Sequence, residues 1–185
     1  MKLSILICTL PERAHHLNHM MSLLSPQFQD GVEIISDNRQ RSVPTGQKRN
    51  ELIKRAQGEW IVFVDDDDHI EPTYIADILK ALESNPDVVT FKGWMTTNGK
   101  ANVDWCIKLG EKYEARTDPD GITRYYRFPN HLCPMRKSLV QDIKFQHIWQ
   151  GEDYGWAKKI NDFGLLKTEV HIEKRLYHYK FITGK

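Results

Sequence analysis

One stretch of the chain, residues 60–69, strongly limits the possible fold; it reads WIVFVDDDDH. Residues 61–64 are four consecutive apolar residues, each β-branched or aromatic, a pattern typical of a short strand that is buried on both faces of a parallel sheet. Four aspartates, Asp65 to Asp68, follow this strand directly. Ligands of open α/β sheets bind just beyond the carboxyl ends of the strands, so the acidic run is expected at a ligand site.

The acidic run has two interpretations. Adjacent carboxylates repel one another, and a divalent cation relieves that repulsion; Mg²⁺ or Mn²⁺ can be held by one or two carboxylates while substrate phosphates complete the coordination shell. Side chains alternate along a strand, so Asp65 and Asp67 are expected on the same side. The alternative is an acidic surface turn that only solvates the end of the strand. The wholly apolar strand before the run favours the metal-phosphate interpretation.

The first half of the chain alternates apolar strand-like runs with helical segments. This β-α-β-α-β-α-β order indicates an α/β fold with a mostly parallel central sheet and helices on both faces. The expected strands are residues 3–8, 32–36, 60–64 and 88–91, and the expected helices are residues 11–24, 47–57 and 71–84.

The pattern changes after residue 93. Asn98-Gly99 and Asp120-Gly121 are turn signals that predict β-hairpins. The remaining expected elements are a short helix opened by Pro134, a helix over residues 152–163, and two strands between residues 168 and 179 around Lys174-Arg175.

Composition narrows the class of protein. Of the 185 residues, 40% are hydrophobic and the formal net charge is +1, which predicts one domain with a substantial core and no general attraction to nucleic acid or acidic membranes. The scattered cysteines, Cys8, Cys106 and Cys133, form no CxxC pair, which fits a reducing cytoplasm and argues against a zinc site. No apolar run is long enough to span a membrane, and residues 1–8 are too short for a signal peptide. A cytoplasmic protein is therefore expected.

Residues near the predicted strand ends are candidates for nucleotide contacts. Thr9 and Pro11 mark the start of a helix directly after a strand, and such a corner favours anions. Arg13 lies in the first helical turn, where a cation is unfavourable for the helix dipole, so it is either a nucleotide contact or an exposed side chain. Asp37 ends the second strand and either meets a ribose or base or belongs to an ordinary turn.

Three further features carry alternatives. Lys48 and Arg49 lie near the carboxyl edge of the sheet and either face a phosphate or are solvated. Glu152 and Asp153 lie in the first turn of a helix, where the dipole favours ionised carboxylates; they are either routine helix chemistry or the ionised carboxylate that a general base requires. His178 is either a packed histidine or a neutral metal ligand.

Several segments resemble, in chain order, the family-2 glycosyltransferases of GT-A fold. They are LSILICTLPER from residue 3, the strand ending at Asp37, TGQKRN from residue 45, AQGEWIVFVDDDD from residue 56 and GEDY from residue 151. The resemblance implies a single GT-A domain over residues 1–185, in which residues 1–92 bind a nucleotide sugar and residues 93–185 bind the acceptor and supply the catalytic base. The chain departs from many relatives in carrying DNRQ from residue 37 instead of Asp-Asp-Gly-Ser.

The resemblance also implies roles in the transfer of a sugar from a nucleoside diphosphate sugar, with a UDP-sugar as the expected donor. Asp65-Asp66-Asp67 looks like the DxD motif, and Mn²⁺ or Mg²⁺ is expected on Asp67, Asp65 and His178. Asp153 matches the acceptor base of inverting members, with Glu152 beside it. Nucleotide-sugar contacts are expected from Thr9, Leu10, Pro11, Arg13, Asp37, Lys48, Arg49, Asp65 and Asp66. Acceptor contacts are expected from Asn130, His131 and Trp149.

Two other functions compete with sugar transfer. Nucleotidyl transfer would usually show a Gly-rich loop after the first strand, which residues 9–13 lack, and the intact acidic motifs argue against a non-catalytic nucleotide-sugar-binding module. The acceptor is expected to be a glycan, a lipid or a small molecule. A modified nucleic acid is a further candidate, because basic residues cluster in sequence. They are Arg39, Arg41, Lys48, Arg49, Lys54 and Arg55, followed by Arg116, Arg124, Arg127, Arg136 and Lys137. The donor sugar, the acceptor and the oligomeric state stay open at this point.

Overall fold

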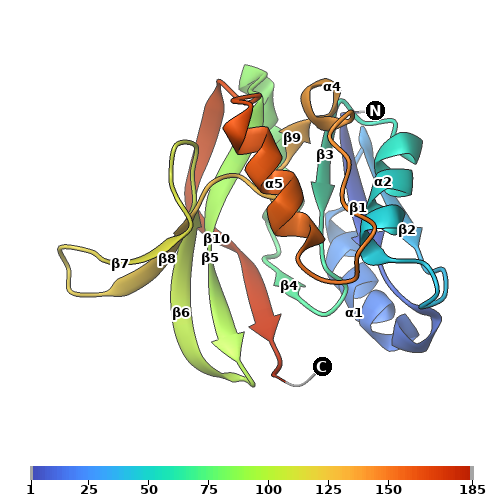
Figure 1. Ribbon diagram of the computed structural model, residues 1–185, viewed down its shortest axis with the longest axis horizontal. Coiled ribbons are helices and arrows are strands. Elements are labelled where there is room, and N and C mark those ends of the chain that lie inside the picture. Colours follow the sequence, from blue (N-terminus) through green and yellow to red (C-terminus); the bar gives the residue numbers. More distant parts are fainter. Residues whose placement is uncertain (1, 184–185) are drawn as a thin grey trace.

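The computed structural model describes residues 2–183 and shows a twisted sheet flanked by helices, with one hairpin projecting from the sheet (Figure 1). The strands are β1 (Leu3–Cys8), β2 (Val32–Asp37), β3 (Trp60–Phe63), β4 (His69–Ile70), β5 (Val88–Thr97), β6 (Lys100–Ile107), β7 (Glu114–Thr117), β8 (Thr123–Arg127), β9 (Met135–Arg136) and β10 (Glu169–Phe181). The helices are α1 (Ala14–Leu24), α2 (Thr45–Arg55), α3 (Tyr74–Ala81), α4 (Lys137–Val140) and α5 (Glu152–Asp162), with 3-10 turns at Pro11–Arg13, Ser25–Gln27 and Leu82–Ser84. Within residues 2–183, no helix is both long and apolar enough to cross a bilayer.

The described residues form one sheet of ten strands. The order is β2-β1-β3-β9-β5-β6-β8-β7, and β10 joins the sheet through β5 and β4. β1 pairs in parallel with both β2 and β3. The short strand β9 pairs antiparallel with both β3 and β5, so β5 runs in the same direction as β3, and β10 pairs in parallel with β5. The predicted α/β fold with a mostly parallel central sheet is confirmed.

The crossover connections place helices on both faces of the sheet. From β1 the chain passes through α1 to β2, which neighbours β1 on one side within the sheet. It then returns through α2 to β3, which neighbours β1 on the other side. Crossovers between parallel strands are right-handed, so α1 and α2 lie on opposite faces. The α2 face is the one toward which Phe63 points, because the Arg49 guanidinium of α2 lies over the Phe63 ring.

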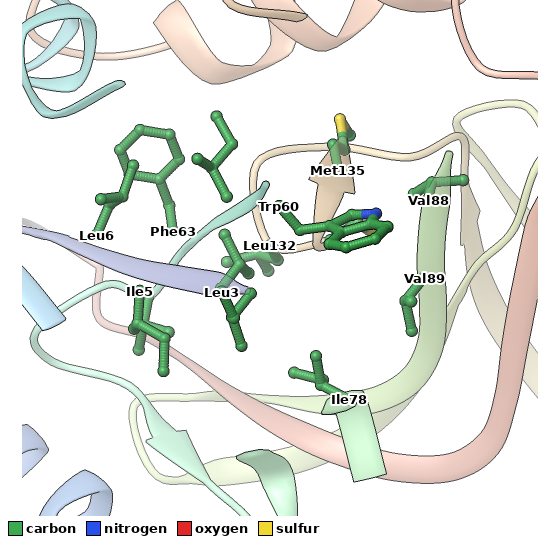
Figure 2. Packing of buried hydrophobic residues seen from close by; sticks show 14 of the residues in the cluster. Leu3, Ile5, Leu6, Trp60, Phe63, Ile78, Val88, Val89, Leu132 and Met135 are labelled. Carbon is green, nitrogen blue, oxygen red and sulfur yellow. The ribbon is translucent and has the colours of Figure 1, made fainter. Parts of the chain in front are cut away.

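The core alternates between these two faces. In the pairing of β1 with β3, Leu6 is the partner of Phe63 and Leu3 is the partner of Trp60. Figure 2 shows Leu6 and Phe63 on one side of the sheet, and Leu3 and Ile5 on the other, toward Ile78 of α3. Both sets are fully buried. Burial on both faces explains why these strands read as unbroken apolar runs in the sequence.

Both predicted hairpins form. Asn98 and Gly99 have positive φ angles of 51° and 73° in the turn between β5 and β6, as a two-residue turn of type I′ requires. Gly121, with a φ angle of 79°, lies between β7 and β8. The β7–β8 hairpin is the one that projects from the sheet in Figure 1.

The C-terminal part of the chain differs from the prediction. The two strands expected around Lys174-Arg175 are wrong, because β10 is one continuous strand of 13 residues. Its register against β5 shifts between Ile172 and Arg175 and again between Arg175 and Tyr177. Such irregularities interrupt the alternation of side chains, so the pattern reads as two strands. The short helix α4 follows β9 instead of beginning at Pro134.

The predicted boundary between a nucleotide-sugar half and an acceptor half lies inside a strand. Residues 92 and 93 both belong to β5, which pairs with β6, β9 and β10. The two halves therefore share one sheet, and their separate roles stay a prediction.

Replacing Gly93 by alanine is expected to destabilise the protein. A Cβ atom at Gly93 would lie 2.1 Å from the Trp105 ring and 2.4 Å from the Tyr177 carbonyl oxygen, and overpacking of a core costs about 1–3 kcal/mol. Gly155 of α5 is the control, because an added Cβ has no atom within 4 Å there. Gly155→Ala should instead raise the free energy of unfolding by about 0.5–1 kcal/mol. Urea denaturation measures both changes, and effects of the same sign would contradict the close approach at Gly93.

Candidate active site

The aspartates of the acidic run alternate between buried and partly exposed positions. Asp66 and Asp68 are 3% and 0% exposed. Asp65 and Asp67 are partly exposed and line the same two cavities. Asp65 and Asp67 therefore share one side of the run, as expected, although β3 ends at Phe63 and residues 65–68 form a turn in which the Asp68 N–H donates to the Asp65 carbonyl (3.3 Å).

Asp66 ties the acidic run to the loop after β1. It accepts hydrogen bonds from the Thr9 hydroxyl (2.5 Å) and from Arg13 Nε (3.0 Å). The Arg13 guanidinium also pairs with Asp67, at 2.9 Å from Nη2 to Oδ2. Burial alone would lower the pKa of Arg13, but its bonds to the two aspartates outweigh burial and raise that pKa. Two of the residues predicted to meet the nucleotide thus position the acidic run itself.

Asp68 ties the run to β10. It accepts hydrogen bonds from the Tyr177 hydroxyl (2.7 Å) and from the Lys180 backbone N–H (2.8 Å). Burial is the largest reason why the pKa of Asp68 lies well above its ordinary value. The Tyr177 hydroxyl also accepts a hydrogen bond from the Asp65 N–H (3.0 Å). Sequence reasoning missed Tyr177, although its alternation with Tyr179 at strand spacing marks one face of β10.

Asp65 has two basic partners. Arg49 Nη2 lies 3.0 Å from Oδ1, and His131 Nε2 lies 3.4 Å from Oδ2. Burial alone would raise the pKa of Asp65, but Arg49 and His131 outweigh burial and lower that pKa below its ordinary value. Asp65 therefore stays ionised at neutral pH and available to a cation.

Arg49 connects the acidic run to α5. Its Nε donates to Glu152 Oε1 at 3.0 Å, and Arg49 and Glu152 are 5% and 4% exposed. Burial alone would lower the pKa of Arg49, but the surrounding carboxylates, Asp65 first, raise it. Arg49 precedes the buried Leu52 and Ile53 by three and four residues, and this helical spacing would have predicted its inward position from the sequence.

Contacts with α2 also fix the loop that leads into α5. The Gly46 N–H donates to the Ile148 carbonyl at 3.2 Å, and a Cβ at Gly46 would lie 1.7 Å from the Gln146 carbonyl oxygen. The Asn50 side-chain amide donates to the Phe145 carbonyl (3.0 Å) and accepts from the Phe145 N–H (2.9 Å). Only glycine permits the close contact at position 46. Asn50 holds the backbone of Phe145 by two hydrogen bonds. Both residues belong to the TGQKRN segment, in which the sequence predicts site roles for Lys48 and Arg49 alone.

The start of α5 brings the predicted base to the acidic run. Gly151 precedes the helix with a φ angle of 79°, and Glu152 and Asp153 form its first turn. Asp153 Oδ2 lies 3.5 Å from Nδ1 of His131, whose Nε2 faces Asp65. One imidazole thus stands between the acidic run and the predicted base.

Two adjoining cavities open on the acidic run. Cavity A has a volume of about 470 Å³ and cavity B a volume of about 570 Å³. Both are lined by Thr45, Arg49, Asp65, Asp67, Trp149 and Gln150. Cavity A is further lined by Cys8, Thr9, Leu10, Arg13, Arg41, Lys48 and Asp66. Cavity B is further lined by His131, Gly151, Glu152, Asp153, Tyr179, Lys180, Phe181 and Ile182. Asp65 and Asp67 therefore stand in the wall that the two cavities share.

Asp37 and Lys48 hold loops beside cavity A. Arg39 Nη2 donates to Asp37 Oδ2 at 2.6 Å; burial alone would raise the pKa of Asp37, but the bonds from Arg39 lower it. Lys48 Nζ donates to the Thr9 carbonyl (2.7 Å) and to the Arg39 carbonyl (2.5 Å). Their predicted contacts with base and phosphate stay predictions.

His178 has partners away from both cavities. Its Nε2 lies 2.9 Å from the Thr96 hydroxyl, and its ring stacks on Trp94 with centroids 4.7 Å apart. Alternation along β10 places His178 on the opposite face from Tyr177, which reaches the acidic run. The structure does not bring His178 together with Asp65 and Asp67 in either cavity.

The predicted acceptor residues differ in position, because Trp149 and His131 line a cavity and Asn130 does not. Asn130 is 2% exposed, donates to the Tyr113 hydroxyl (3.2 Å) and accepts from the Leu132 N–H (3.1 Å), so it shapes its own loop and does not line either cavity. Trp149 is 48% exposed and lines both. Pro11 begins the 3-10 turn after β1 and is exposed outside the cavity linings.

Most of the basic residues that suggested a nucleic acid acceptor are neutralised or buried. Lys48 and Arg49 are 3% and 5% exposed. Ion pairs with carboxylates hold Arg39, Arg41, Arg116, Arg124 and Arg136. Neighbouring carboxylates offset part of the positive charge that would attract a polyanion, so these contacts do not favour a nucleic acid acceptor.

Asp65 and Asp67 fit a metal site in which the protein supplies only two carboxylates and the phosphates of a substrate supply the other ligands. Within residues 2–183, no group of three or more His, Cys, Asp or Glu side chains is arranged to hold a metal ion. Mg²⁺ and similar cations need only one or two protein carboxylates when phosphates complete the shell. Asp65 and Asp67, on the shared wall of the cavities, meet that smaller requirement.

Comparison with known sequences identifies one family. The profile of Glycosyl transferase family 2 matches residues 24–144, well over half of the chain. No curated protein matches the sequence.

Solved structures of S. aureus TarS are similar in fold. TarS 1-349 in complex with UDP has a TM-score of 0.73 and 18% identity, over 97% of this chain and 60% of that one. TarS 1-349 in complex with UDP-GlcNAc has a TM-score of 0.69 and 16% identity, over 100% of this chain and 60% of that one. A third TarS structure has a TM-score of 0.68 and 17% identity, over 97% of this chain and 37% of that one. The chain thus spans 60% or less of these TarS chains, and the likeness establishes the fold of the shared part.

Replacing Arg49 by methionine is expected to destabilise the protein by roughly 3 kcal/mol, because it leaves Asp65 and Glu152 without their buried partner. Arg55→Met is the control, since Arg55 lies on the exposed face of the same helix and its loss should change stability by less than about 0.5 kcal/mol. Chemical denaturation measures both.

The effect of Arg49→Met should depend on pH. Arg49 holds the pKa of Asp65 below its ordinary value, so this stabilisation is present above pH ~3.9 and is lost as the pH falls below it. The difference between wild type and variant should shrink in acid. A difference that grew in acid would contradict the assignment of the pair.

Proposed function

The chain belongs to glycosyl transferase family 2, and from this membership we propose that it transfers a sugar from a nucleoside diphosphate sugar to an acceptor hydroxyl. The observation that carries the proposal is the wall of Asp65 and Asp67 shared by two adjoining cavities. A group-transfer enzyme must hold its two substrates against each other, and adjoining cavities with a common acidic wall meet that need.

Cavity A is the proposed donor site. Thr9, Leu10 and Arg13 line it from the loop after β1, and Lys48 lines it from α2. Pro11 lies in this loop, and the Asp37 carbonyl at the end of β2 accepts a hydrogen bond from the Thr9 N–H (3.0 Å); both complete the proposed nucleotide contacts. The TarS chains of similar fold are in complex with UDP and UDP-GlcNAc, which makes a UDP-sugar the first donor to test.

A divalent cation, Mn²⁺ or Mg²⁺, is proposed on Asp67 and Asp65 together with the donor diphosphate. When bound there, it offsets the negative charge that develops on the leaving diphosphate. Arg13, which also bonds Asp66, keeps the Asp67 carboxylate in place from the side of β1, and Arg49 keeps the Asp65 carboxylate in place from α2. His178, which bonds Thr96 and stacks on Trp94, is not part of this proposed site.

Asp153 is the proposed general base. Its carboxylate lines cavity B, where an acceptor hydroxyl can approach it. Asp153 takes the proton of that hydroxyl as the acceptor oxygen forms a bond to the anomeric carbon, and the bond from that carbon to the diphosphate breaks with its electrons leaving on the diphosphate. Attack from the face opposite the leaving group inverts the anomeric configuration in one displacement. Glu152, held by Arg49, fixes the turn that carries the base.

Cavity B is the proposed acceptor site. It is lined by residues from α5 and from the end of β10, and Trp149 offers an exposed aromatic face at its edge. An aromatic ring beside carboxylates suits a glycan or another polyhydroxylated acceptor, whose apolar and hydroxyl faces both need partners. Residues 93–185 thus supply most of the proposed acceptor site and the base.

Release of free nucleoside diphosphate tests the enzyme class. Incubation with UDP-, GDP- and dTDP-sugars and Mn²⁺ is expected to release diphosphate slowly from one donor even without an acceptor, with water taking its place. EDTA should abolish the release, and Asp67→Ala should lower it by at least about 100-fold. Asp30→Ala, which removes an exposed carboxylate outside the cavities, is the control. No release and no thermal stabilisation by any donor would contradict the proposed function.

Asp153→Asn tests the base. The variant is expected to lower kcat by about 10²–10⁴-fold, because an amide cannot accept the proton. Its affinity for UDP, measured by calorimetry, should stay within a factor of two or so of the wild type, since Asp153 lines cavity B and not cavity A. Asp162→Asn, at the exposed far end of the same helix, is the control. Turnover near that of wild type in Asp153→Asn would overturn the base assignment.

A further inference from the structure

His131 lies between two carboxylates of different function. Its Nε2 is 3.4 Å from Asp65 Oδ2, and its Nδ1 is 3.5 Å from Asp153 Oδ2. The residue is 5% exposed, and Nδ1 is buried with no hydrogen-bond partner at ideal geometry in the described part of the chain. A buried ring nitrogen of this kind costs free energy unless a nearby acceptor or donor satisfies it. Asp153 is the carboxylate placed to do so.

The backbone holds His131 firmly in that position. The His131 carbonyl accepts a hydrogen bond from the Phe63 N–H at 2.9 Å, so the residue is fastened to the end of β3, directly before the acidic run. The next residues are held too, since Asn130 accepts from the N–H groups of Leu132 and Cys133. The ring of Phe63 lies 6.4 Å from the imidazole. The backbone that carries the imidazole is therefore fixed, and the burial of His131 leaves the ring little room to turn.

Asp153, by contrast, has little else to orient it. Its side chain is 37% exposed in the first turn of α5. Among residues 2–183, His131 is the one side chain whose charged or polar atoms pair with its carboxylate. Glu152, the neighbour of Asp153, is fixed by Arg49 instead. A carboxylate on an exposed helical turn can rotate about its side-chain bonds unless a partner selects one orientation.

We propose that His131 is a positioning residue that orients Asp153 for proton abstraction, an inference that rests on the proposed function. Its Nδ1 side engages Asp153 Oδ2 and leaves the other carboxylate oxygen to face the acceptor hydroxyl. Its Nε2 side faces Asp65, so the imidazole lies between the base and the wall that holds the donor. This role differs from the direct acceptor contact predicted from the sequence.

Amide replacements separate the two nitrogens of the ring. The side-chain amide of asparagine reaches about where Nδ1 lies, whereas that of glutamine reaches about where Nε2 lies. His131→Gln should therefore lower kcat for hydrolysis of UDP-GlcNAc, or of whichever donor sugar is turned over, by about 10- to 100-fold, as expected for a misplaced reacting group. His131→Asn should retain most of the rate. The affinity for UDP and the melting temperature of the two variants should match, because both lose the same ring.

A double-mutant cycle with Asp153→Asn completes the test. If His131 acts through Asp153, adding His131→Gln to Asp153→Asn should cost nothing further in kcat. Additive losses would overturn the proposal and indicate an independent role, such as a direct acceptor contact. Equal losses in His131→Asn and His131→Gln, tracking lower melting temperatures, would overturn it in favour of packing. Weaker UDP binding in His131→Asn alone would assign the ring to Asp65 instead.

The same experiment distinguishes this inference from the proposed function. Turnover by the wild type together with unchanged kcat in His131→Gln would overturn the positioning role and leave glycosyl transfer intact. Absence of turnover by the wild type on every donor sugar would overturn the proposed function, and the positioning role with it.

Discussion

The site depends on one buried guanidinium. Arg49 of α2 pairs with Asp65 after β3 and with Glu152 at the start of α5, a partner 103 residues away in sequence. Removing such charges from water is costly, and their mutual attraction repays that cost only in good geometry. The Arg49 guanidinium also lies 4.8 Å from the centroid of the Phe63 ring, which adds a cation–π contribution. Because each of these groups compensates the others, the acidic run and the helix with the proposed base keep one relative position.

The four consecutive aspartates, Asp65 to Asp68, have different roles because their surroundings differ. Asp66 and Asp68 turn inward and act as fixed hydrogen-bond acceptors for the loop after β1 and for β10. Asp65 and Asp67 turn outward into the cavities. The hydrogen bonds of Asp66 and Asp68 fix the backbone of the run. Asp65 and Asp67 therefore face the cavities even though their two negative charges repel each other. Such preorganisation means that a ligand finds the two carboxylates already on one wall.

Local patterns in the sequence predicted the parts of this architecture that depend on neighbours in the chain. The unbroken apolar run of β3 follows from its burial on both faces, and the turn at Asn98-Gly99 follows from residues that tolerate positive φ angles; both are found in the structure. The long-range contacts were not predictable in this way. Tyr177 reaches Asp65 across 112 residues, and the irregular register of β10 hides its continuity.

Arg49 shows the same division between local and distant information. Helical spacing could place it on the inward face of α2, but no local pattern names Glu152 as its partner. For His178 the sequence leaves a packed histidine and a metal ligand both open, because its neighbours along β10 do not say which partners it meets; in the structure it bonds Thr96 and stacks on Trp94. β10 reaches the acidic run across long loops of chain. The Tyr177 hydroxyl and the Lys180 N–H bond Asp68 from 109 and 112 residues away in sequence. Closing such loops costs conformational entropy, so the wall that β10 supplies to cavity B rests on buried contacts that must offset this cost.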